Sequence, residues 1–241
     1  MDNNMQKDLV SARKFGPEHG FLKAVPVLFG LSDEALTELA RLLTKRLFSK
    51  DSHVFYQDDR VEHLFFLEFG RIEIYKSDMD GRKLTMWFIQ PGDVFCLANL
   101  YAQKSFANAM AVVDSSLYCL KRSDLGRFLL AHSELSHSLV QCLSVKLASY
   151  STILDDIAFL NVTSRMAKIL LQHKKESAAG QFFCELNQSE LAGRLGTCRE
   201  VVCRTLGRMR AAGVIDTKPE GKVRGVIIRD LKKLADYVQD S

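Results

Sequence analysis

The hydrophobic positions of the chain follow two different periods. Before about residue 120, apolar and aromatic residues gather in short runs of strand length. These runs are residues 64–69, 71–76, 84–89 and 116–120. The turn signals between them are Gly70, Asp80-Gly81 and Pro91-Gly92-Asp93. Since an Asp-Gly pair between two alternating runs is typical of a hairpin, this part predicts an antiparallel β-barrel or sandwich.

From Ser133 to Ile157 the period changes to that of a helix. The stretch contains no Gly or Pro, and its apolar residues recur three and four positions apart. It predicts a helix about 37 Å long at 1.5 Å per residue. Such a helix has more apolar surface than a small β domain needs, so we expect it to join two chains in a homodimer. Packing within a single chain is the alternative. Lys146 and Ser149 interrupt the apolar stripe, so a strict heptad is not expected.

Two short helices joined by a glycine turn are predicted near the C-terminal end. Asn187 and Glu190 match a capping box for a helix over 189–195. Gly196 suits a left-handed turn, and a second helix follows from about 199 to 212. The expected common buried face consists of Leu191, Ala192, Leu195, Val202, Leu206 and Met209. This arrangement is a helix-turn-helix unit, with a generic helical hairpin as the alternative.

Charge sets the same region apart. Residues 161–241 contain 15 Lys+Arg and 9 Asp+Glu, whereas the whole chain contains 33 and 29. The second predicted helix carries Arg199, Glu200 and Arg204 on its outer face, and a strand pair with a charged turn follows at 214–228, as in a winged helix. A surplus of positive charge could also serve only to keep the protein soluble, and this is the alternative. Together, the charge, the recognition-helix residues and the strand pair predict that the region binds double-stranded DNA.

Four segments resemble the CRP/FNR family of transcription regulators. They are FGRIEIY (69–75), PGDVF (91–95), IAFLNVTSRMAKILL (157–171) and the helix-turn-helix, which matches Q-x-E-L-A-x-x-x-G-x-x-R-E-x-x-x-R. The resemblance spans nearly the whole chain. It implies an α+β fold with an N-terminal antiparallel β-barrel of the jelly-roll, cyclic-nucleotide-binding-like kind, a dimerisation helix and a C-terminal winged helix-turn-helix.

The predicted organisation has five parts. They are a mobile N-terminus (1–20), an effector-sensing β-barrel domain (21–132), a dimerisation helix (133–158), a hinge (159–163) and a winged helix-turn-helix DNA-binding domain (164–241). Asn161 and Thr163 are expected to cap a helix that begins at about Ser164. The resemblance implies an allosteric mechanism, in which an effector in the barrel repacks the dimer helices and the hinge then presents both recognition helices to DNA.

The resemblance assigns base contacts to Arg199, Glu200 and Arg204, on a TGTGA-like inverted repeat. An Arg can donate two hydrogen bonds to guanine, and a Glu can accept one from cytosine N4. The expected phosphate contacts, at helix N-termini, are Gln188, Ser189, Thr197 and Cys198. Cys198 and Cys203 lie five residues apart and cannot form a bridge within one helix, so we expect small tolerated residues there rather than a redox switch.

The effector is predicted to differ from cAMP. In cAMP-binding members a Glu after a Gly holds the ribose and an Arg-Ser/Thr pair holds the phosphate. Here these positions fall on Cys96-Leu97 and Ser105-Phe106, and Lys104 is the nearby base. A phosphate buried without a cation is unfavourable. The N-terminal cysteine cluster of iron–sulfur members is also absent, since the first cysteine is Cys96.

A largely apolar effector pocket is the remaining expectation. Its residues are Trp87, Phe95, Cys96, Leu97, Ser105, Phe106, Tyr150 and Ser151. Such a pocket suits a small organic effector. A haem-dependent sensor of NO, CO or O2 is one alternative. Another is that the aromatic side chains simply fill the core of the barrel. A non-specific architectural DNA-binding protein is a more remote alternative.

Composition narrows the class further. The 241 residues are 47% hydrophobic and 26% charged, typical of a folded chain with a real core. Six cysteines without a CxxC pair argue against structural zinc, and no metal site is expected. No nucleophilic triad, HExxH or phosphate-cradling loop is present, so we expect no enzyme. Without a signal peptide or an apolar span, we expect a cytoplasmic protein whose partners are an operator, a second copy, RNA polymerase and an effector, with no membrane.

Overall fold

The computed structural model describes residues 9–13, 19–98, 101–102, 104–178, 180–217 and 225–239. It divides into two compact units, residues 1–76 with 86–149 and residues 77–85 with 150–241. The predicted α+β class is confirmed. Most of the predicted N-terminal segment 1–20 and most of the charged turn of the predicted wing lie outside the described residues.

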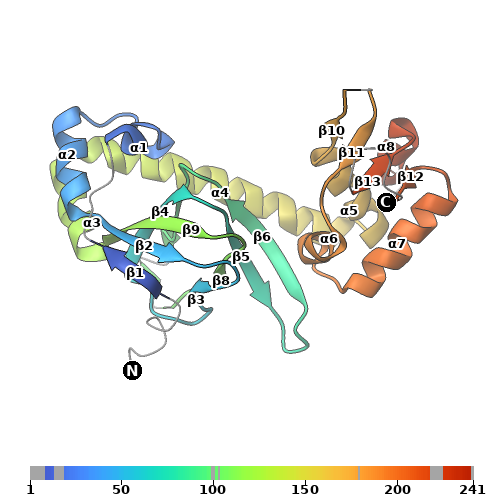
Figure 1. Cartoon of the computed structure of the whole chain (residues 1–241), viewed down its shortest axis with the longest axis horizontal. Helices are drawn as coiled ribbons and strands as arrows, with labels where there is room; N and C mark the ends of the chain where they lie inside the picture. The colour runs from blue at the N-terminus through green and yellow to red at the C-terminus, as the bar shows by residue number, and fades with distance from the viewer. Residues whose placement is uncertain are drawn as a thin grey trace. The chain divides into compact units, whose positions relative to one another are not determined.

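Two antiparallel sheets build the first unit (Figure 1), with strand orders β1-β2-β9-β4-β7 and β3-β8-β5-β6. The strands are β1 (Leu9–Arg13), β2 (Thr44–Phe48), β3 (His53–Phe55), β4 (His63–Phe69), β5 (Ile72–Ser77), β6 (Lys83–Ile89), β7 (Val94–Phe95), β8 (Asn108–Ala111) and β9 (Ser115–Lys121). The predicted Asp-Gly hairpin joins β5 to β6, and the Asp78 N–H donates to the Arg82 carbonyl across 3.0 Å. Part of the segment predicted to be mobile, Leu9–Arg13, is therefore a strand paired with β2.

Strands β4 and β9 are buried on both faces. Phe65 and Leu67 of β4 point into a core between the two sheets, where Leu117 and Cys119 of β9 join them. Their chain neighbours point the other way, into a second core beneath the helices. This explains why β4 is an unbroken apolar run rather than an alternating one, as expected for a strand covered on both sides.

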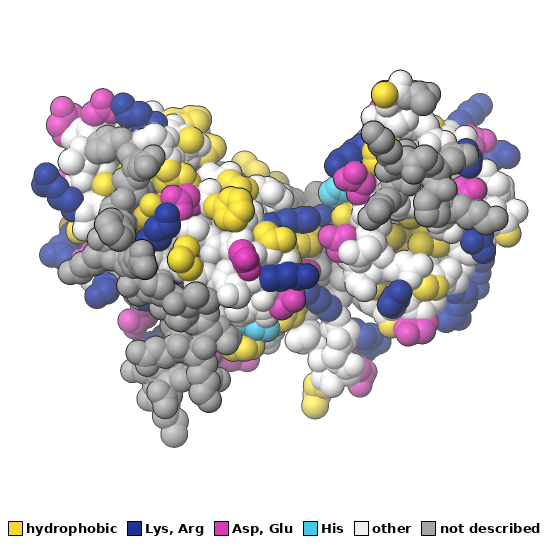
Figure 2. Space-filling view, viewed as in Figure 1, with side chains coloured by type: hydrophobic (Ala, Val, Ile, Leu, Met, Phe, Trp, Pro, Cys, Tyr) yellow, Lys and Arg dark blue, Asp and Glu magenta, His cyan; other side chains and the backbone are white. Residues whose placement is uncertain are grey.

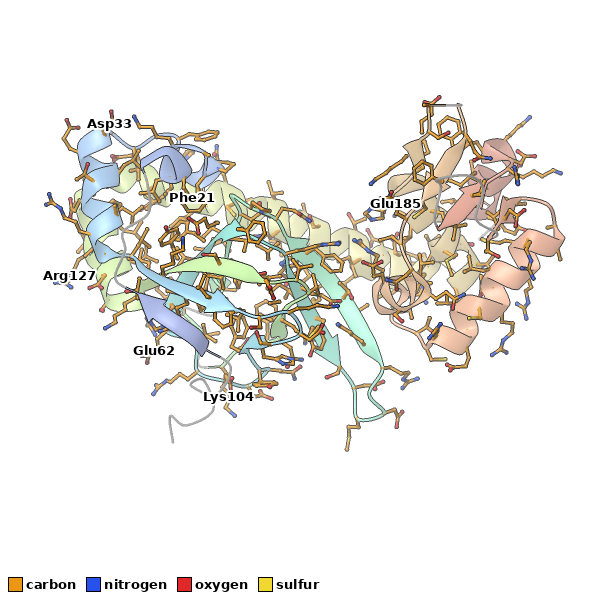
Figure 3. The ribbon with its side chains drawn as sticks, viewed as in Figure 1. Phe21, Asp33, Glu62, Lys104, Arg127 and Glu185 are labelled. Atoms are coloured by element: carbon orange, nitrogen blue, oxygen red, sulfur yellow. The ribbon has the colours of Figure 1, made fainter. Side chains whose placement is uncertain are left out.

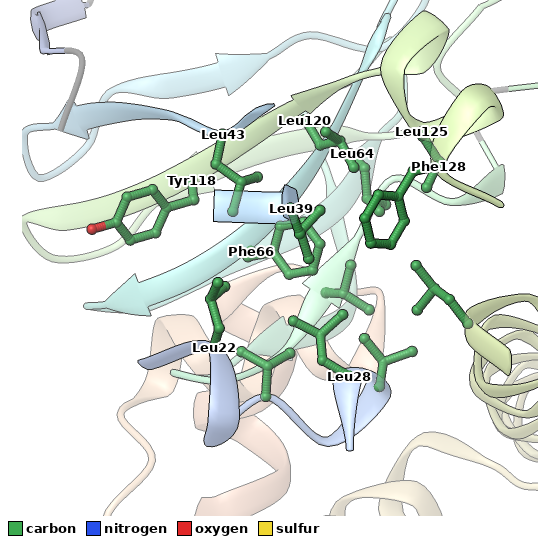
Figure 4. Close-up of a cluster of buried hydrophobic side chains, with 14 of the residues drawn as sticks. Leu22, Leu28, Leu39, Leu43, Leu64, Phe66, Tyr118, Leu120, Leu125 and Phe128 are labelled. Carbon is green, nitrogen blue, oxygen red and sulfur yellow. The ribbon is translucent and has the colours of Figure 1, made fainter. Parts of the chain in front are cut away.

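Helices cover the outer face of the five-stranded sheet. They are α1 (His19–Lys23), η1 (Pro26–Leu28), α2 (Asp33–Leu42), α3 (Arg122–Ala131) and the N-terminal part of α4 (Ser133–Phe159). Figure 4 shows Leu22, Leu28 and Leu39 of this layer meeting Phe66 and Tyr118 of the sheet. Phe21, labelled in Figure 3, lies with its ring centroid 5.4 Å from that of Tyr118.

Gly70 sits where no other residue fits. Its φ is +97°, and an added Cβ would lie 2.6 Å from the Asp114 carbonyl oxygen and against Ser115 Oγ. We expect Gly70→Ala to lower the free energy of unfolding by about 2–3 kcal/mol, because backbone strain and overpacking add. Chemical denaturation measures this change.

Gly81 is the matched control for that substitution. Its φ is +77°, but nothing lies within 4 Å of an added Cβ. Gly81→Ala therefore adds the backbone strain alone, about 1 kcal/mol. Equal losses in the two variants would show that the close approach at Gly70 has no energetic role.

His63 predicts a loss of stability in mild acid. Burial, reinforced by the positive charges of Arg46 and Lys121, lowers the pKa of His63 to about 4. The unfolded chain, with the ordinary value near 6.5, takes up the proton first, so stability present above pH 6.5 is lost as the pH falls towards 4. Between pH 7 and pH 5 we expect a loss of about 1 kcal/mol, allowing for the partial exposure of the ring. Urea unfolding at the two pH values should show this loss in the wild type and a smaller one in His63→Gln; equal losses would contradict the assignment.

The second unit is a small helical domain with one sheet, ordered β10-β11-β13-β12. Its elements are α5 (Val162–Gln172), β10 (Lys175–Glu176), β11 (Phe182–Cys184), α6 (Gln188–Leu195), α7 (Arg199–Ala211), β12 (Ile215–Asp216), β13 (Val226–Ile228) and α8 (Leu231–Gln239). All six residues predicted to form the common face of the two short helices are buried in one core. Glu185, labelled in Figure 3, forms an ion pair with Lys175 next to that sheet.

The link between α4 and α5 is shorter than the predicted hinge of 159–163. Helix α4 ends at Phe159 and α5 begins at Val162, because the side chain of Asn161 caps α5. Its Oδ1 accepts hydrogen bonds from the backbone N–H groups of Thr163 (2.9 Å) and Ser164 (3.1 Å). The helix therefore begins two residues before the predicted Ser164. An ion pair between Asp156 and Lys168 connects the last turns of α4 to α5.

Helix α4 leaves a row of apolar side chains exposed. The row, here called the α4 stripe, consists of Val140, Leu143, Leu147, Leu154 and Ile157. Its members are spaced by three, four, seven and three residues, which is the heptad pattern of a coiled-coil seam. Lys146 and Ser149 lie outside this row, and the expectation that they interrupt the seam stays a prediction.

Candidate nucleic-acid interface and effector region

The turn between α6 and α7 is fixed by backbone hydrogen bonds. Asn187 Oδ1 accepts from the N–H groups of Ser189 (2.9 Å) and Glu190 (3.0 Å), and Glu190 Oε2 accepts from the Asn187 N–H (2.9 Å). This is the predicted capping box. Gly196 adopts φ +62°, and the Thr197 N–H returns to the Ala192 carbonyl across 3.0 Å. The start of α7 is thereby held rigidly against α6.

The three predicted base-reading residues lie at the start of α7. Arg199 and Glu200 are its first two residues, Arg204 follows within the second turn, and all three are exposed. Figure 2 shows Lys and Arg side chains along the edge of the unit that α7 forms. The pKa of Glu200 is held below its ordinary value by its own backbone N–H at the helix N-terminus, then by Cys198 and Arg199. Glu200 is therefore a hydrogen-bond acceptor at neutral pH.

The predicted phosphate-contacting residues flank the two helix starts. Gln188 and Ser189 are the first residues of α6, and Thr197 and Cys198 directly precede α7. Cys198 is the N-cap of α7, although its thiol makes no capping hydrogen bond. The backbone N–H groups of a helix N-terminus suit an anion, and the phosphate contacts of these four residues stay a prediction.

A contact that the sequence did not predict connects the two helices. Gln188 Oε1 accepts hydrogen bonds from Arg199 Nε (3.1 Å) and from Cys203 Sγ (3.2 Å). Arg199 and Cys203 are four residues apart and so share one face of α7. That spacing is visible in the sequence, but the approach of Gln188 from α6 depends on how the two helices cross.

The residues predicted to line the effector pocket separate into two groups in the first unit. Phe95 is buried in the core between the sheets, and Trp87, Cys96 and Phe106 pack against it. Leu97 belongs instead to the core beneath the helices. Ser105 is buried, and its hydroxyl donates to the Ala107 carbonyl across 2.7 Å.

Cys96 has an unusual backbone conformation. Its φ is +74°, in the left-handed region that favours glycine. The resemblance places the Gly of the cAMP-binding pattern at this position. The backbone at Cys96 therefore has the conformation that glycine favours, as the pattern requires. The side chain after it does not match the pattern, since Leu97 stands where the pattern has Glu.

Lys146 is a candidate effector contact that the sequence did not single out. Its Nζ lies 5.6 Å from the centroid of the Trp87 ring, a cation–π arrangement. It also lines a cavity of about 360 Å³ between α4 and the turn before β7. The residues lining this cavity are Pro26, Val27, Gly92, Asp93, Val94, Ser138, Gln141, Cys142, Val145 and Lys146. As a cation among the apolar residues of the predicted helix 133–158, Lys146 was a signal available in the sequence.

Tyr150 and Ser151 lie on α4 within the second unit. Burial raises the pKa of the Tyr150 hydroxyl, so it stays protonated and can donate a hydrogen bond. Ser151 is exposed. Their assignment to an effector site stays a prediction.

The described residues carry neither an evident metal site nor a helix that could cross a membrane. No group of three or more His, Cys, Asp or Glu side chains there is arranged to hold a metal ion. Nor does the described part contain a helix with the length and apolar character needed to cross a membrane.

Comparisons with known proteins cover both units. Residues 45–132 match the cyclic nucleotide-binding domain, and residues 164–237 match the Crp-like helix-turn-helix domain. The cyclic AMP receptor protein of Thermus thermophilus is 27% identical over 199 residues, covering 82% of this chain and 91% of that protein.

Solved structures show the same fold. A mutant of CooA from Carboxydothermus hydrogenoformans aligns with a TM-score of 0.72 and 20% identity, over 89% of this chain and 95% of that one. The c-di-GMP responsive global regulator CLP of Xanthomonas campestris aligns with a TM-score of 0.70 and 19% identity, over 83% and 99% of the two chains. With a cyclic nucleotide-binding domain followed by a Crp-like helix-turn-helix, the chain belongs to the CRP/FNR family of DNA-binding transcription regulators.

Proposed function

We propose that the protein is an effector-responsive regulator that binds a TGTGA-like inverted repeat as a homodimer and senses a small molecule other than cAMP. One observation carries the DNA specificity. Arg199, Glu200 and Arg204 are exposed together over the first two turns of α7, on a helix-turn-helix held by a complete capping box. This is the part of a recognition helix that enters the major groove.

The chemistry of these side chains matches the proposed half-site. The guanidinium groups of Arg199 and Arg204 can each donate two parallel hydrogen bonds to guanine O6 and N7. The ionised Glu200 accepts from cytosine N4 and is repelled by the guanine and thymine acceptors at the same place. Two arginines and one glutamate therefore favour a site with several G·C pairs.

The α4 stripe supports the homodimer. Two copies that meet along it are related by a two-fold axis, which requires two inverted half-sites about one helical turn apart. The phosphate contacts proposed for Gln188, Ser189, Thr197 and Cys198 would fix the register of each half on the DNA. RNA polymerase and the effector are further proposed partners.

The pocket segment supports an effector other than cAMP. The position of the ribose-binding Glu holds Leu97, which is buried among apolar side chains. The position after Ser105 holds Phe106, which packs against the core between the sheets. Lys104 is exposed, and Figure 3 shows it at the rim of its unit. A buried cyclic phosphate needs a cation beside it, so these positions favour a less charged ligand.

The proposed mechanism is a shift between two states of α4 and the α4–α5 link. An effector bound in the first unit would favour the state in which both copies of α7 match the spacing of the two half-sites. A nearly complete switch needs an effector that prefers one state by about 5.5 kcal/mol. Asp156 and Lys168 form an ion pair across the α4–α5 link. Such a shift would move these two residues relative to each other.

Selection of binding sites from random DNA tests the proposed specificity. A TGTGA-like inverted repeat should be enriched and should bind about 10³–10⁷ times more tightly than unrelated DNA at the same salt concentration. Binding without a preferred sequence, weakened steeply by salt, would instead identify an architectural DNA-binding protein.

The effector is tested separately. A thermal-shift screen of small organic molecules should find one that also changes operator affinity, whereas cAMP should change neither. After incubation with haem and removal of the unbound haem, an absorbance spectrum of the protein should show no Soret band. Such a band would support the haem-dependent alternative, and cAMP-dependent operator binding would overturn the proposal.

A further inference from the structure

We propose that Gln188 is a positioning residue that orients Arg199 for base recognition, and that Cys203 holds Gln188 in place. This inference rests on the proposed reading of bases by Arg199. It gives Gln188 a role in specificity rather than only the phosphate contact expected from its place at the start of α6. It also gives Cys203 a role where the sequence suggested only a tolerated small residue.

The geometry converges on one oxygen atom. Gln188 Oε1 lies 3.1 Å from Arg199 Nε and 3.2 Å from Cys203 Sγ, and both are donors. A carbonyl oxygen has two lone pairs, so it can accept both hydrogen bonds at once. The contact joins the first residue of α6 to the first turns of α7, whose mutual placement the capping box and Gly196 already fix.

The atom that Gln188 engages suits base recognition. Of the five N–H donors of a guanidinium group, this contact uses the one on Nε. The four donors on the two terminal nitrogens are not consumed by it, so they can form the end-on pair of hydrogen bonds to guanine O6 and N7. An Arg held through Nε also loses less rotational freedom when it binds, because its planar fork is already oriented.

Cys203 contributes as the second donor to the same oxygen. Its side chain is exposed and lies one turn after Arg199 on the same face of α7. A thiol is a weak donor, so its contribution is smaller than that of a charged guanidinium. It nevertheless favours the Gln188 rotamer that directs the carbonyl oxygen, rather than the amide N–H donors that a phosphate would accept from, towards α7.

The two roles of Gln188 predict different losses. A residue that contacts phosphate changes affinity uniformly for all sequences, since the backbone carries no sequence information. A residue that orients Arg199 changes the discrimination at the one base pair that Arg199 reads. Affinity measured over a panel of operators therefore separates the two roles, whatever the overall affinity.

The test compares Gln188→Ala, Cys203→Ala and a matched control, Ser189→Ala, in the full-length chain. Ser189 is the next residue of α6 and is exposed, but it makes no contact with Arg199 in the structure described. Each variant is titrated with the selected operator and with operators carrying the other three base pairs at each position of one half-site. Unfolding curves verify that each variant is folded.

We expect Gln188→Ala to reduce discrimination about fivefold to tenfold at a single base pair and to leave the other positions near the wild type. Cys203→Ala should reduce discrimination about twofold at that same pair. Gln188→Glu keeps an acceptor oxygen at this place, so it should retain the discrimination at that base pair. Ser189→Ala should change all operators alike.

A double-mutant cycle with Arg199→Ala makes the assignment specific. In the Arg199→Ala background, Gln188→Ala should cause no further loss of discrimination. A uniform loss over all operators in Gln188→Ala, or unchanged discrimination in both Gln188→Ala and Cys203→Ala, would overturn the inference alone. A wild type with no preferred sequence, or an Arg199→Ala variant with undiminished discrimination, would overturn the proposed function with it.

Discussion

Replacing Arg204 with alanine should remove the preference for one base pair in each half-site of the operator. A bidentate contact between Arg and guanine gives about 1–3 kcal/mol of discrimination, and a homodimer makes the contact twice. The selected operator should therefore lose about 2–6 kcal/mol of its advantage over operators substituted at that pair. Competition binding between the two kinds of operator measures this loss directly.

Lys232→Ala is the matched control for that substitution. Lys232 is an exposed cation on α8 of the same unit, so its removal lowers the charge equally without touching α7. This variant should bind every operator somewhat more weakly and leave the preference intact. If Arg204→Ala behaved in the same way, Arg204 would be a phosphate contact and the proposed base reading would be wrong.

Introducing a charge into the α4 stripe should separate the proposed dimer. Leu147 is 71% exposed in the single chain and occupies a central position of the heptad. In a homodimer each copy would bury its Leu147 side chain, worth about 1.5–3 kcal/mol apiece. Leu147→Glu loses both contributions and brings two carboxylates together, so the dissociation constant should rise by at least about 100-fold. Sedimentation velocity over a range of protein concentrations measures it.

Val145→Glu separates this effect from a general response to a new charge on α4. Val145 is 68% exposed, nearly the same as Leu147, but it lies outside the stripe and lines the cavity with Lys146. It should remain dimeric and bind the operator as a dimer. A monomeric Val145→Glu variant, or a dimeric Leu147→Glu variant, would show that the α4 stripe is not the contact between copies.

The helix-turn-helix was predictable because its determinants are local. The capping box at Asn187 and Glu190 and the left-handed turn at Gly196 each depend on residues within one or two turns, and the structure has all of them. The first residue of α5 was predicted less accurately. Asn161 caps α5 two residues before the start that the sequence predicted at Ser164, and nothing in the local pattern distinguished a cap at Asn161 from one at Thr163.

The effector region was harder to predict because strand neighbours belong to different cores. Phe95 and Leu97 are two residues apart, yet one lies between the sheets and the other beneath the helices. The short strand β7 ends between them, and the unusual backbone at Cys96 follows it, so the alternation expected of a continuous strand does not hold. The contacts from Lys146 to Trp87 and from Gln188 to Arg199 depend on tertiary packing, and a single sequence carries no record of them.

The dimer proposed along the α4 stripe would also make the abundance of the protein a regulatory quantity. For a dimer that dissociates at cellular concentrations, the amount of DNA-binding species rises with the square of the number of chains, by mass action. Doubling synthesis would then raise operator occupancy up to about fourfold while sites are in excess. Such a regulator would respond to its own expression level as well as to its ligand, and substitutions along α4 would set the threshold between the two.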